Sequence, residues 1–306
     1  MTIHVHGTVV TQYGVAANNR GENEGNLTTL QKVLWKGELH TSVSAEAIRF
    51  AMRYYWQTVY DDTKDEILRV NRRWNEDSQD YTFEDQAFSK KKYIDDDVMG
   101  YMDAKAAQAE KEDEEGEEEK KPAKKQKGTT NARRGALEVS RAISLYPYFG
   151  ETSFNARGGQ KGKTSLYATE MHATSYQYSF SFTPTQLEKP ERASAVLDAI
   201  GDLAQVGGNQ GRFLYDFSPQ AVVFRITHDP APRILYVFNQ EVGGPLQLSE
   251  LIRRTQVGDI AANELIVGGL LESSEAAVIL RDYGAQVFNG VRDAVVAAKE
   301  RIGKEV

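Results

Sequence analysis

Two arginines spaced one helical turn apart are the residues of this sequence best placed for binding chemistry. Arg49 and Arg53 lie in the stretch HTSVSAEAIRFAMRYYW, residues 40–56. Residues four apart on a helix share a face, so both guanidinium groups would point the same way. A guanidinium group can engage phosphate through two parallel hydrogen bonds, so a phosphate backbone is one candidate ligand, although the pair alone does not identify it. The alternative interpretation is a solvated helix face without a ligand.

Three further stretches could bind phosphate in a similar way. They are NARRG, RGGQKGK and the glycine-rich VGGNQGR, whose backbone N–H groups could surround an anion. Basic positions spread over loops and one helix suit a protein that follows a phosphate backbone. Taken singly, each stretch is also explained as unrelated surface charge, and the glycine loop as a helix C-cap. The candidate residues in these stretches are Arg133, Arg134, Arg157, Lys161, Lys163, Asn209 and Arg212.

Residues with catalytic or metal-binding chemistry form no convincing set. His4 and His6 share one strand face without a third ligand nearby, so two ordinary strand histidines are the simpler interpretation. Asp95, Asp96 and Asp97 are consecutive and cannot all face one site. The chain has no cysteine, no P-loop and no G-x-S-x-G motif. We therefore expect no metal, no cofactor and no enzymatic activity.

Composition is that of a soluble protein of the cytoplasm. The chain has 306 residues, 40% of them hydrophobic, which is enough for a sizeable core. No apolar run approaches the roughly 20 residues that span a bilayer, and the first ten residues do not form a signal peptide. The net charge of −7 does not exclude a nucleic-acid partner, because much of the acid lies in one run.

The regular elements predict an α+β fold. A β-branched strand opens the chain, and a helix follows from Ser44, which is a suitable N-cap. Alternating aromatic residues indicate a strand near 172–184, a helix is expected at 190–206, and two strands at 221–229 and 233–242. Strands and helices do not alternate as in a doubly wound sheet, so we expect a ferredoxin-like antiparallel sheet with helices on one face.

Segments between these elements are expected to be insertions. Residues 54–94 are polar and aromatic without a clean period and suggest a helical insertion. Residues 105–130 contain a block of acid followed by a block of lysine, which is typical of a disordered loop. Residues 150–168 have the glycines and lysines of an exposed hairpin.

Five stretches, taken together and in order, resemble one protein family. They are HTSVSAEAIRFAMR, DDDVMGYM, GALEVSRAISL, TEMHATSYQYSFSF and VGGNQGRFLYDFSP. The sequence resembles the backbone subunit of type I CRISPR surveillance complexes (Cascade), in the DevR-like branch associated with type I-B. The resemblance covers nearly the whole chain. The acid-then-lysine run within 105–130 departs from the family pattern.

The resemblance implies one RNA-recognition-motif-like (RRM-like) palm over residues 1–306, with an inserted finger at 54–94 and a thumb at 150–168. Such subunits assemble head to tail with copies of themselves along the guide RNA (crRNA), join other Cascade subunits, and present the guide to the target DNA strand. The positions that match the family's RNA-binding elements are Asn19 and Arg20 after the first strand, Ser44, Arg49 and Arg53 on the helix, Arg157, Lys161 and Lys163 on the thumb, and Asn209 and Arg212 on the glycine loop. The candidates to wedge between bases are Leu166, Tyr167 and Met171.

Two other functions remain as alternatives. Related backbone subunits of type III complexes cut RNA with an aspartate in the early loop, where this chain has Glu22 and Glu24 instead. A metal-dependent RNA-cleaving subunit is therefore the second hypothesis. A DNA-binding regulator is the third, but no helix-turn-helix pattern supports duplex reading.

Overall fold

A nine-stranded sheet is the centre of the molecule. The computed structural model describes residues 2–59, 67–104, 130–157, 165–208, 212–270 and 274–305. The strands of the sheet follow the order β21–β20–β17–β1–β16–β12–β6–β5, and β11 also pairs with β16. Neighbouring strands are antiparallel except for β20 and β21. The predicted α+β class is confirmed. The strand bounds are β1 His4–Thr11, β5 Lys32–Trp35, β6 Glu38–Val43, β11 Leu137–Val139, β12 Ala142–Ser144, β16 Tyr176–Phe182, β17 Pro219–Thr227, β20 Leu265–Gly268 and β21 Gln286–Phe288.

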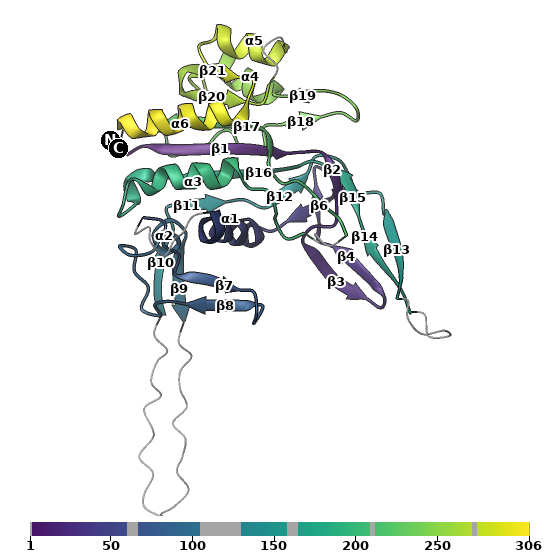
Figure 1. Ribbon diagram of the computed structural model, residues 1–306. Helices are drawn as coiled ribbons and strands as arrows, with labels where there is room; N and C mark the ends of the chain where they lie inside the picture. The colour runs from purple at the N-terminus through teal and green to yellow at the C-terminus, as the bar shows by residue number, and fades with distance from the viewer. Residues whose placement is uncertain are drawn as a thin grey trace, which may run out of the picture.

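Four neighbouring strands of this sheet and the two helices that connect them form one unit. In chain order they are β1, α1 (Ala45–Val59), β11, β16, α3 (Arg192–Gly201) and β17. In space the strands lie in the order β17–β1–β16–β11, with every neighbouring pair antiparallel. Figure 1 shows α3 running beside β1 and β16, with α1 next to it. Each helix therefore connects two strands that have one other strand between them.

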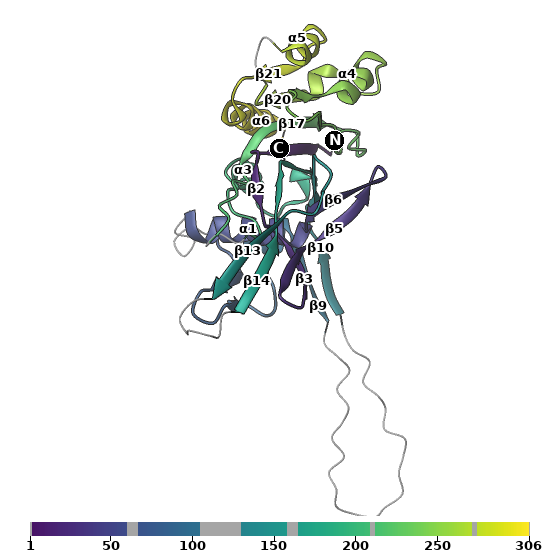
Figure 2. The same ribbon diagram turned by 90° about the vertical axis from the view of Figure 1, so that its right-hand side faces the viewer.

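Side chains that alternate along the strands produce a hydrophobic core on each face of the sheet. Val222, Phe224 and Ile226 of β17 pack with residues of α1, α3 and α6 (Val291–Glu305). Val223 points to the opposite face, where α4 (Ser249–Gln256) and α5 (Glu275–Asp282) complete a second core. The expectation of helices on one face is therefore wrong, and Figure 2 shows α4 and α5 beyond β20 on the far side from α1. No helix in the described part of the chain is long and apolar enough to cross a membrane.

The described residues of the insertion expected at 54–94 contain a β hairpin, whereas further helices were expected there. Beyond the end of α1, β7 (Arg72–Asn75) pairs with β8 (Asp80–Phe83), and the short helix α2 (Ile94–Val98) follows. Trp74 and Tyr81 pack edge to face against each other and against Phe50 of α1. Bulky aromatic residues favour strands, and these pairs explain why the segment forms a hairpin rather than helices.

Two further strands, β9 (Gly100–Ala104) and β10 (Thr130–Arg134), pair next to this hairpin. The segment predicted to be a disordered loop, 105–130, lies outside the described residues except for its last residue, Thr130, which begins β10. Both strand pairs project from the side of the sheet that carries α1 (Figure 1).

A four-stranded arm projects from the other end of the main sheet (Figure 1). Its strands are β13 (Thr152–Arg157) and β14 (Ser165–Glu170), joined to β4 (Leu27–Leu30) and β3 (Arg20–Glu24). β13 and β14 form the antiparallel hairpin expected at 150–168, and its tip lies outside the described residues. At the base of the arm, β2 (Gly14–Ala16) pairs with β15 (His172–Thr174).

The strand expected at 233–242 is mostly a loop across the second face of the sheet. Arg233 and Tyr236 both have positive φ angles, which a strand does not contain. Ile234, Val237 and Phe238 are buried in the second core, so their hydrophobicity anchors a loop. The remaining elements are β18 (Asn239–Gln240), β19 (Leu246–Gln247) and the 3-10 turns η1 (Pro184–Gln186) and η2 (Ala262–Glu264).

Candidate nucleic-acid interface

Three segments predicted to bind one ligand do meet at the start of α1. Ser44 Oγ accepts a hydrogen bond from the Ala47 amide at 3.2 Å, as an N-cap does, and donates one to Asn19 Oδ1 at 3.3 Å. The backbone N–H of Asn19 in turn donates to the Gly207 carbonyl at 2.6 Å. The early loop, the helix start and the loop after α3 therefore meet at one junction.

Backbone conformation at this junction requires small or permissive residues. Asn19 has a φ of 56° and Gly207 a φ of 55°, both in the left-handed region. A Cβ on Gly207 would lie 3.4 Å from Ala47 Cβ and 3.5 Å from the Asn19 nitrogen. The N-terminal N–H groups of a helix attract anions, so the junction lies at an electropositive end of α1. Glu46 in the first turn partly offsets this potential.

A residue that the sequence did not nominate adds a cation to the same junction. Arg141 Nη1 donates to Gln31 Oε1 at 3.0 Å and to Ser42 Oγ at 3.2 Å. The backbone N–H of Gln31 donates to the backbone carbonyl of Asn19, so Gln31 connects Arg141 to Asn19. Arg141 lies in the stretch GALEVSRAISL, but nothing local in that pattern separates it from other surface arginines.

The two arginines of α1 are more enclosed than expected. Arg53 has a side-chain exposure of 12%, and its Nε lies 3.8 Å from Asp95 Oδ2. Arg49 Nη2 donates to the Met99 carbonyl at 2.7 Å. The two side chains therefore do not form a freely solvated helix face, because the segment around α2 packs over them. Their role in RNA binding stays a prediction.

A third arginine nevertheless leaves this group with an excess of positive charge. Burial lowers the pKa of Arg49 and of Arg53. The charges of Glu46 and Asp95 oppose this, and the nearby charge of Arg72 on β7 lowers both pKa values further. Arg72 is exposed, and its guanidinium lies 4.2 Å from the centre of the Tyr81 ring. We call Arg49, Arg53 and Arg72 the arginine cluster. Arg72 is not among the candidate residues expected from the sequence. The stretch around it has no clear hydrophobic period, so nothing there predicts that the hairpin folds back on α1.

Arg133 and Arg134 have partners within the protein instead of forming a flexible basic stretch. Arg133 lies on β10 and donates to the carbonyls of Asp96 and Asp97 at 2.8 Å each and to Asp97 Oδ1 at 3.1 Å. Arg134 is exposed and pairs with Glu138. Arg133 therefore forms an ion pair with Asp97 that holds β10 against α2.

The glycine loop and the arm also meet. Arg212 Nη2 donates to Thr169 Oγ1 of β14 at 3.2 Å, and its guanidinium lies 5.2 Å from the centre of the Tyr167 ring. Leu166 and Tyr167 are exposed on β14, whereas Met171 is half-buried beyond its end. Arg20 is exposed at the start of β3, and Arg157 is the last residue of β13. Lys161, Lys163 and Asn209 lie outside the described residues.

The acidic and histidine candidates do not assemble into a metal site. Among the described residues there is no group of three His, Cys, Asp or Glu side chains that could hold an ion. Glu22 and Glu24 lie on the exposed strand β3. His4 and His6 stack with ring centres 5.8 Å apart and bond to Thr183 and Ser181, so they serve the sheet.

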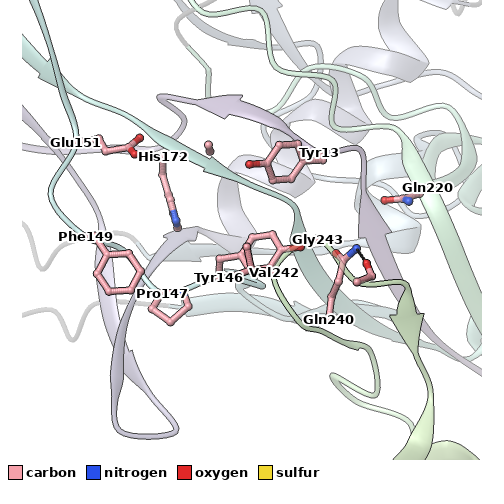
Figure 3. A pocket seen from close by; sticks show the side chains of 12 residues that line it. Tyr13, Tyr146, Pro147, Phe149, Glu151, His172, Gln220, Gln240, Val242 and Gly243 are labelled. Atoms are coloured by element: carbon pink, nitrogen blue, oxygen red, sulfur yellow. Dashed lines mark hydrogen bonds between the residues drawn. The ribbon is translucent and has the colours of Figure 1, made fainter.

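A cavity of about 630 Å³ opens at the base of the arm, where Figure 3 shows its lining. Tyr13 and Tyr146 pack edge to face across it with ring centres 6.1 Å apart, and Phe149 is strongly exposed. Burial lowers the pKa of His172 in its wall to about 4, so this imidazole is neutral at physiological pH. Its Nδ1 lies 2.8 Å from Thr41 Oγ1, which makes it part of the fold.

Comparisons with known proteins agree on one family. The family model described as CRISPR-associated negative auto-regulator DevR/Csa2 matches residues 6–242. A Myxococcus xanthus protein named CRISPR-associated protein Cas7/Cst2/DevR is 42% identical, over 99% of this chain and 98% of its own length. Two solved chains also match, from structures titled CRISPR RNA-guided surveillance complex and CRISPR RNA-guided surveillance complex, pre-nicking. Their TM-scores are 0.58 and 0.57, with 13% and 12% identity and at least 99% of each chain covered, so they support the fold.

Proposed function

Because the chain belongs to the family of the CRISPR-associated DevR/Csa2 proteins, we propose that it is a guide-RNA-binding backbone subunit of a type I surveillance complex (Cascade), of the I-B kind. The two solved structures described above share its fold and are titled RNA-guided surveillance complexes. In this proposal the protein works in the cytoplasm and is not an enzyme. It holds the crRNA and presents it to the target DNA strand.

The strand order supports an RRM-like palm in this role. The order β17–β1–β16–β11 with crossover helices α1 and α3 is that of a ferredoxin-like unit. The two strand pairs β7–β8 and β9–β10 are then the finger, and the hairpin β13–β14 is the thumb. The exposed side chains of Leu166 and Tyr167 on that hairpin are the candidates to separate bases.

The observation that carries the proposal is the unbalanced charge along α1. The arginine cluster holds three guanidinium groups, and Asp95 is the carboxylate paired with one of them. The start of the same helix adds its N–H groups, with Arg141 beside them. A phosphate backbone fits both ends of this helix, since it is a continuous row of anions.

Assembly along the guide follows from the modest strength of each contact. A hydrogen bond to a charged group contributes about 1.5–3 kcal/mol, so a few of them hold RNA weakly. Copies held on one RNA convert weak sites into high avidity, and contacts between them would be head to tail. We propose that copies of this chain and other Cascade subunits are its protein partners.

The test is to purify the protein from cells that transcribe its repeat-spacer locus and to sequence the RNA that co-purifies. We expect repeat-spacer transcripts. Mass photometry on synthetic single-stranded RNAs of increasing length should then show masses that rise in steps of one subunit. RNA of unrelated sequence in cells, together with one-to-one complexes at every length, would contradict the proposal.

A further inference from the structure

Exposed apolar side chains from three separate segments of the chain surround the cavity of Figure 3. Tyr13 lies between β1 and β2 and is 62% exposed, Phe149 precedes β13 and is 87% exposed, and Val242 follows β18 and is 89% exposed. None of these three residues belongs to either hydrophobic core. Apolar residues exposed singly are normal, whereas several that gather around one cavity mark a surface that binds another molecule.

Hydrogen bonds hold the two loops that carry the phenylalanine and the valine. The backbone N–H of Tyr148 donates to the Leu39 carbonyl at 2.7 Å. In the second loop, the backbone N–H of Gly244 donates to the Glu241 carbonyl at 2.9 Å, and Gln240 Nε2 donates to the Gly244 carbonyl at 2.9 Å. Loops that are already ordered lose little conformational entropy when a partner binds, so the exposed side chains are prepared for a contact.

The rim of this cavity is acidic. Glu151 lines the cavity, Glu241 lies in the loop that flanks it, and both side chains are exposed. No lysine or arginine is among the described residues that line the cavity, and His172 is neutral at physiological pH. An adjoining cavity of about 450 Å³ adds Lys36 and Glu38, whose charges offset each other. The surface therefore combines exposed aromatic and aliphatic side chains with an excess of negative charge.

We propose that this cavity binds a protein partner through a bulky apolar side chain that has lysine or arginine on either side of it. Contact of that side chain with Tyr13, Tyr146 and Phe149 removes apolar surface of both molecules from water. Aromatic residues are also enriched where protein interfaces have most of their binding energy. The flanking cations meet the two carboxylates of the rim, which favours this partner over an acidic one and speeds the encounter.

Other occupants fit this surface less well. Nucleobases also stack on aromatic rings, but they arrive on a phosphate backbone, which the carboxylates of Glu151 and Glu241 repel. A second copy of this chain has a net charge of −7, so it is on average repelled in the same way. No residue proposed to contact RNA lines the cavity, so this inference does not rest on the proposed function.

The test is the binding of three labelled hexapeptides to the full chain without RNA, measured by fluorescence anisotropy. The peptides are KKFLKK, KKSSKK and EEFLEE. We expect saturable binding of KKFLKK and at least tenfold weaker binding of the other two. Phe149→Ser should weaken the binding of KKFLKK at least fivefold. Val257→Ser, at a residue 61% exposed at the end of α4, is the matched control and should change nothing.

A charge reversal gives a second measurement that loss of apolar contact alone would not explain. Glu151→Lys should weaken the binding of KKFLKK and strengthen that of EEFLEE. Thermal unfolding of each variant checks that it is folded before binding is measured, and both substituted side chains are exposed.

Three outcomes would overturn the proposal. No saturable binding of KKFLKK to the folded chain would mean that solvent alone meets these side chains. Equal binding of KKFLKK and EEFLEE would show that the rim does not select a basic partner. A loss of RNA affinity, or of stepwise mass growth on RNA, in a Phe149→Ser variant that still binds KKFLKK normally would assign the surface to nucleic acid or to a second copy.

Discussion

Two groups of arginines on one side of the molecule differ in how completely the fold neutralises them. Arg192 and Arg133 surround Asp97, whose side chain is fully buried. Arg192 Nη1 lies 2.8 Å from Asp97 Oδ2 and also donates to the Lys90 carbonyl, and Arg192 Nε donates to the Ile67 carbonyl. The amide of Glu188 donates to the same carboxylate. Every group in this set therefore meets partners within the protein.

The arginine cluster on α1 and β7 is only partly neutralised. Asp95 accepts hydrogen bonds from the amides of Asn71 and Arg72 and lies 3.8 Å from Arg53. The Nε atoms of Arg49 and Arg53 are buried without a hydrogen-bond partner among the described residues. A saturated group joins parts of the fold, whereas an unsaturated cationic one can still take a ligand. Three predictions test this difference.

The largest effect is expected at the saturated group. Asp97→Ala leaves the fully buried Arg192 without its carboxylate, and breaking a buried pair costs about 3–5 kcal/mol. Urea unfolding should therefore show a much lower free energy of unfolding. The exposed Asp77→Ala is the control and should change stability by less than about 0.5 kcal/mol. A loss below about 1 kcal/mol for Asp97→Ala would mean that water replaces the carboxylate and the group does not hold the fold.

The same pair of groups marks the limit of prediction from sequence. Helix periodicity correctly placed Arg49 and Arg53 on one face, and Ser44 caps the helix as expected. The partner of Arg53 is Asp95, more than 40 residues further along the chain, and no local pattern reveals that contact.

Local signals worked where the structure is local and failed where packing decides it. The Tyr176–Phe182 strand and the Arg192–Gly201 helix follow from alternation and helical spacing. The segment containing Trp74 and Tyr81 became a hairpin because their rings pack on α1, which is a tertiary contact. Ile234 and Phe238 suggested a strand but anchor a loop, because a covered sheet face also buries hydrophobic residues.

An intermediate effect, dependent on pH, is expected between the two groups. Burial and the nearby charge of Asp95 raise the pKa of Asp96 to about 6 from its usual 3.8, and Asp85 adds to this. Hydrogen bonds from the Ser89 amide and Asn71 Nδ2 oppose the rise. Since the folded-state pKa is the higher one, ionisation disfavours the folded state. The free energy of unfolding should therefore fall as pH rises from about 4 to about 6.

Asp96→Asn removes that ionisation and tests it. The free energy of unfolding of the variant should match that of the unmodified protein near pH 4 and exceed it by about 1–2 kcal/mol at pH 7.5. This figure is smaller than the pKa shift alone would give, because nearby water screens the charge. Urea unfolding at both pH values measures the difference. An equal difference at the two pH values would show that the pKa of Asp96 is the same in the folded and unfolded chain and that its surroundings do not oppose the charge.

The smallest effect is expected at Arg72, and it decides whether the unbalanced charge serves a ligand. Arg72 is exposed, so Arg72→Gln should leave the free energy of unfolding within about 1 kcal/mol, the cost of its contact with Tyr81 included. If it contacts a phosphate, affinity for single-stranded RNA should fall about five- to tenfold. The slope of the logarithm of the RNA-binding constant against the logarithm of the salt concentration should become shallower by about 0.7, because one phosphate fewer is neutralised and its counterions are not released. Arg253→Gln on α4, paired with Glu250, is the matched control and should change neither quantity. An unchanged slope for Arg72→Gln would mean that solvent alone balances the arginine cluster, and the two groups would then differ in burial but not in function.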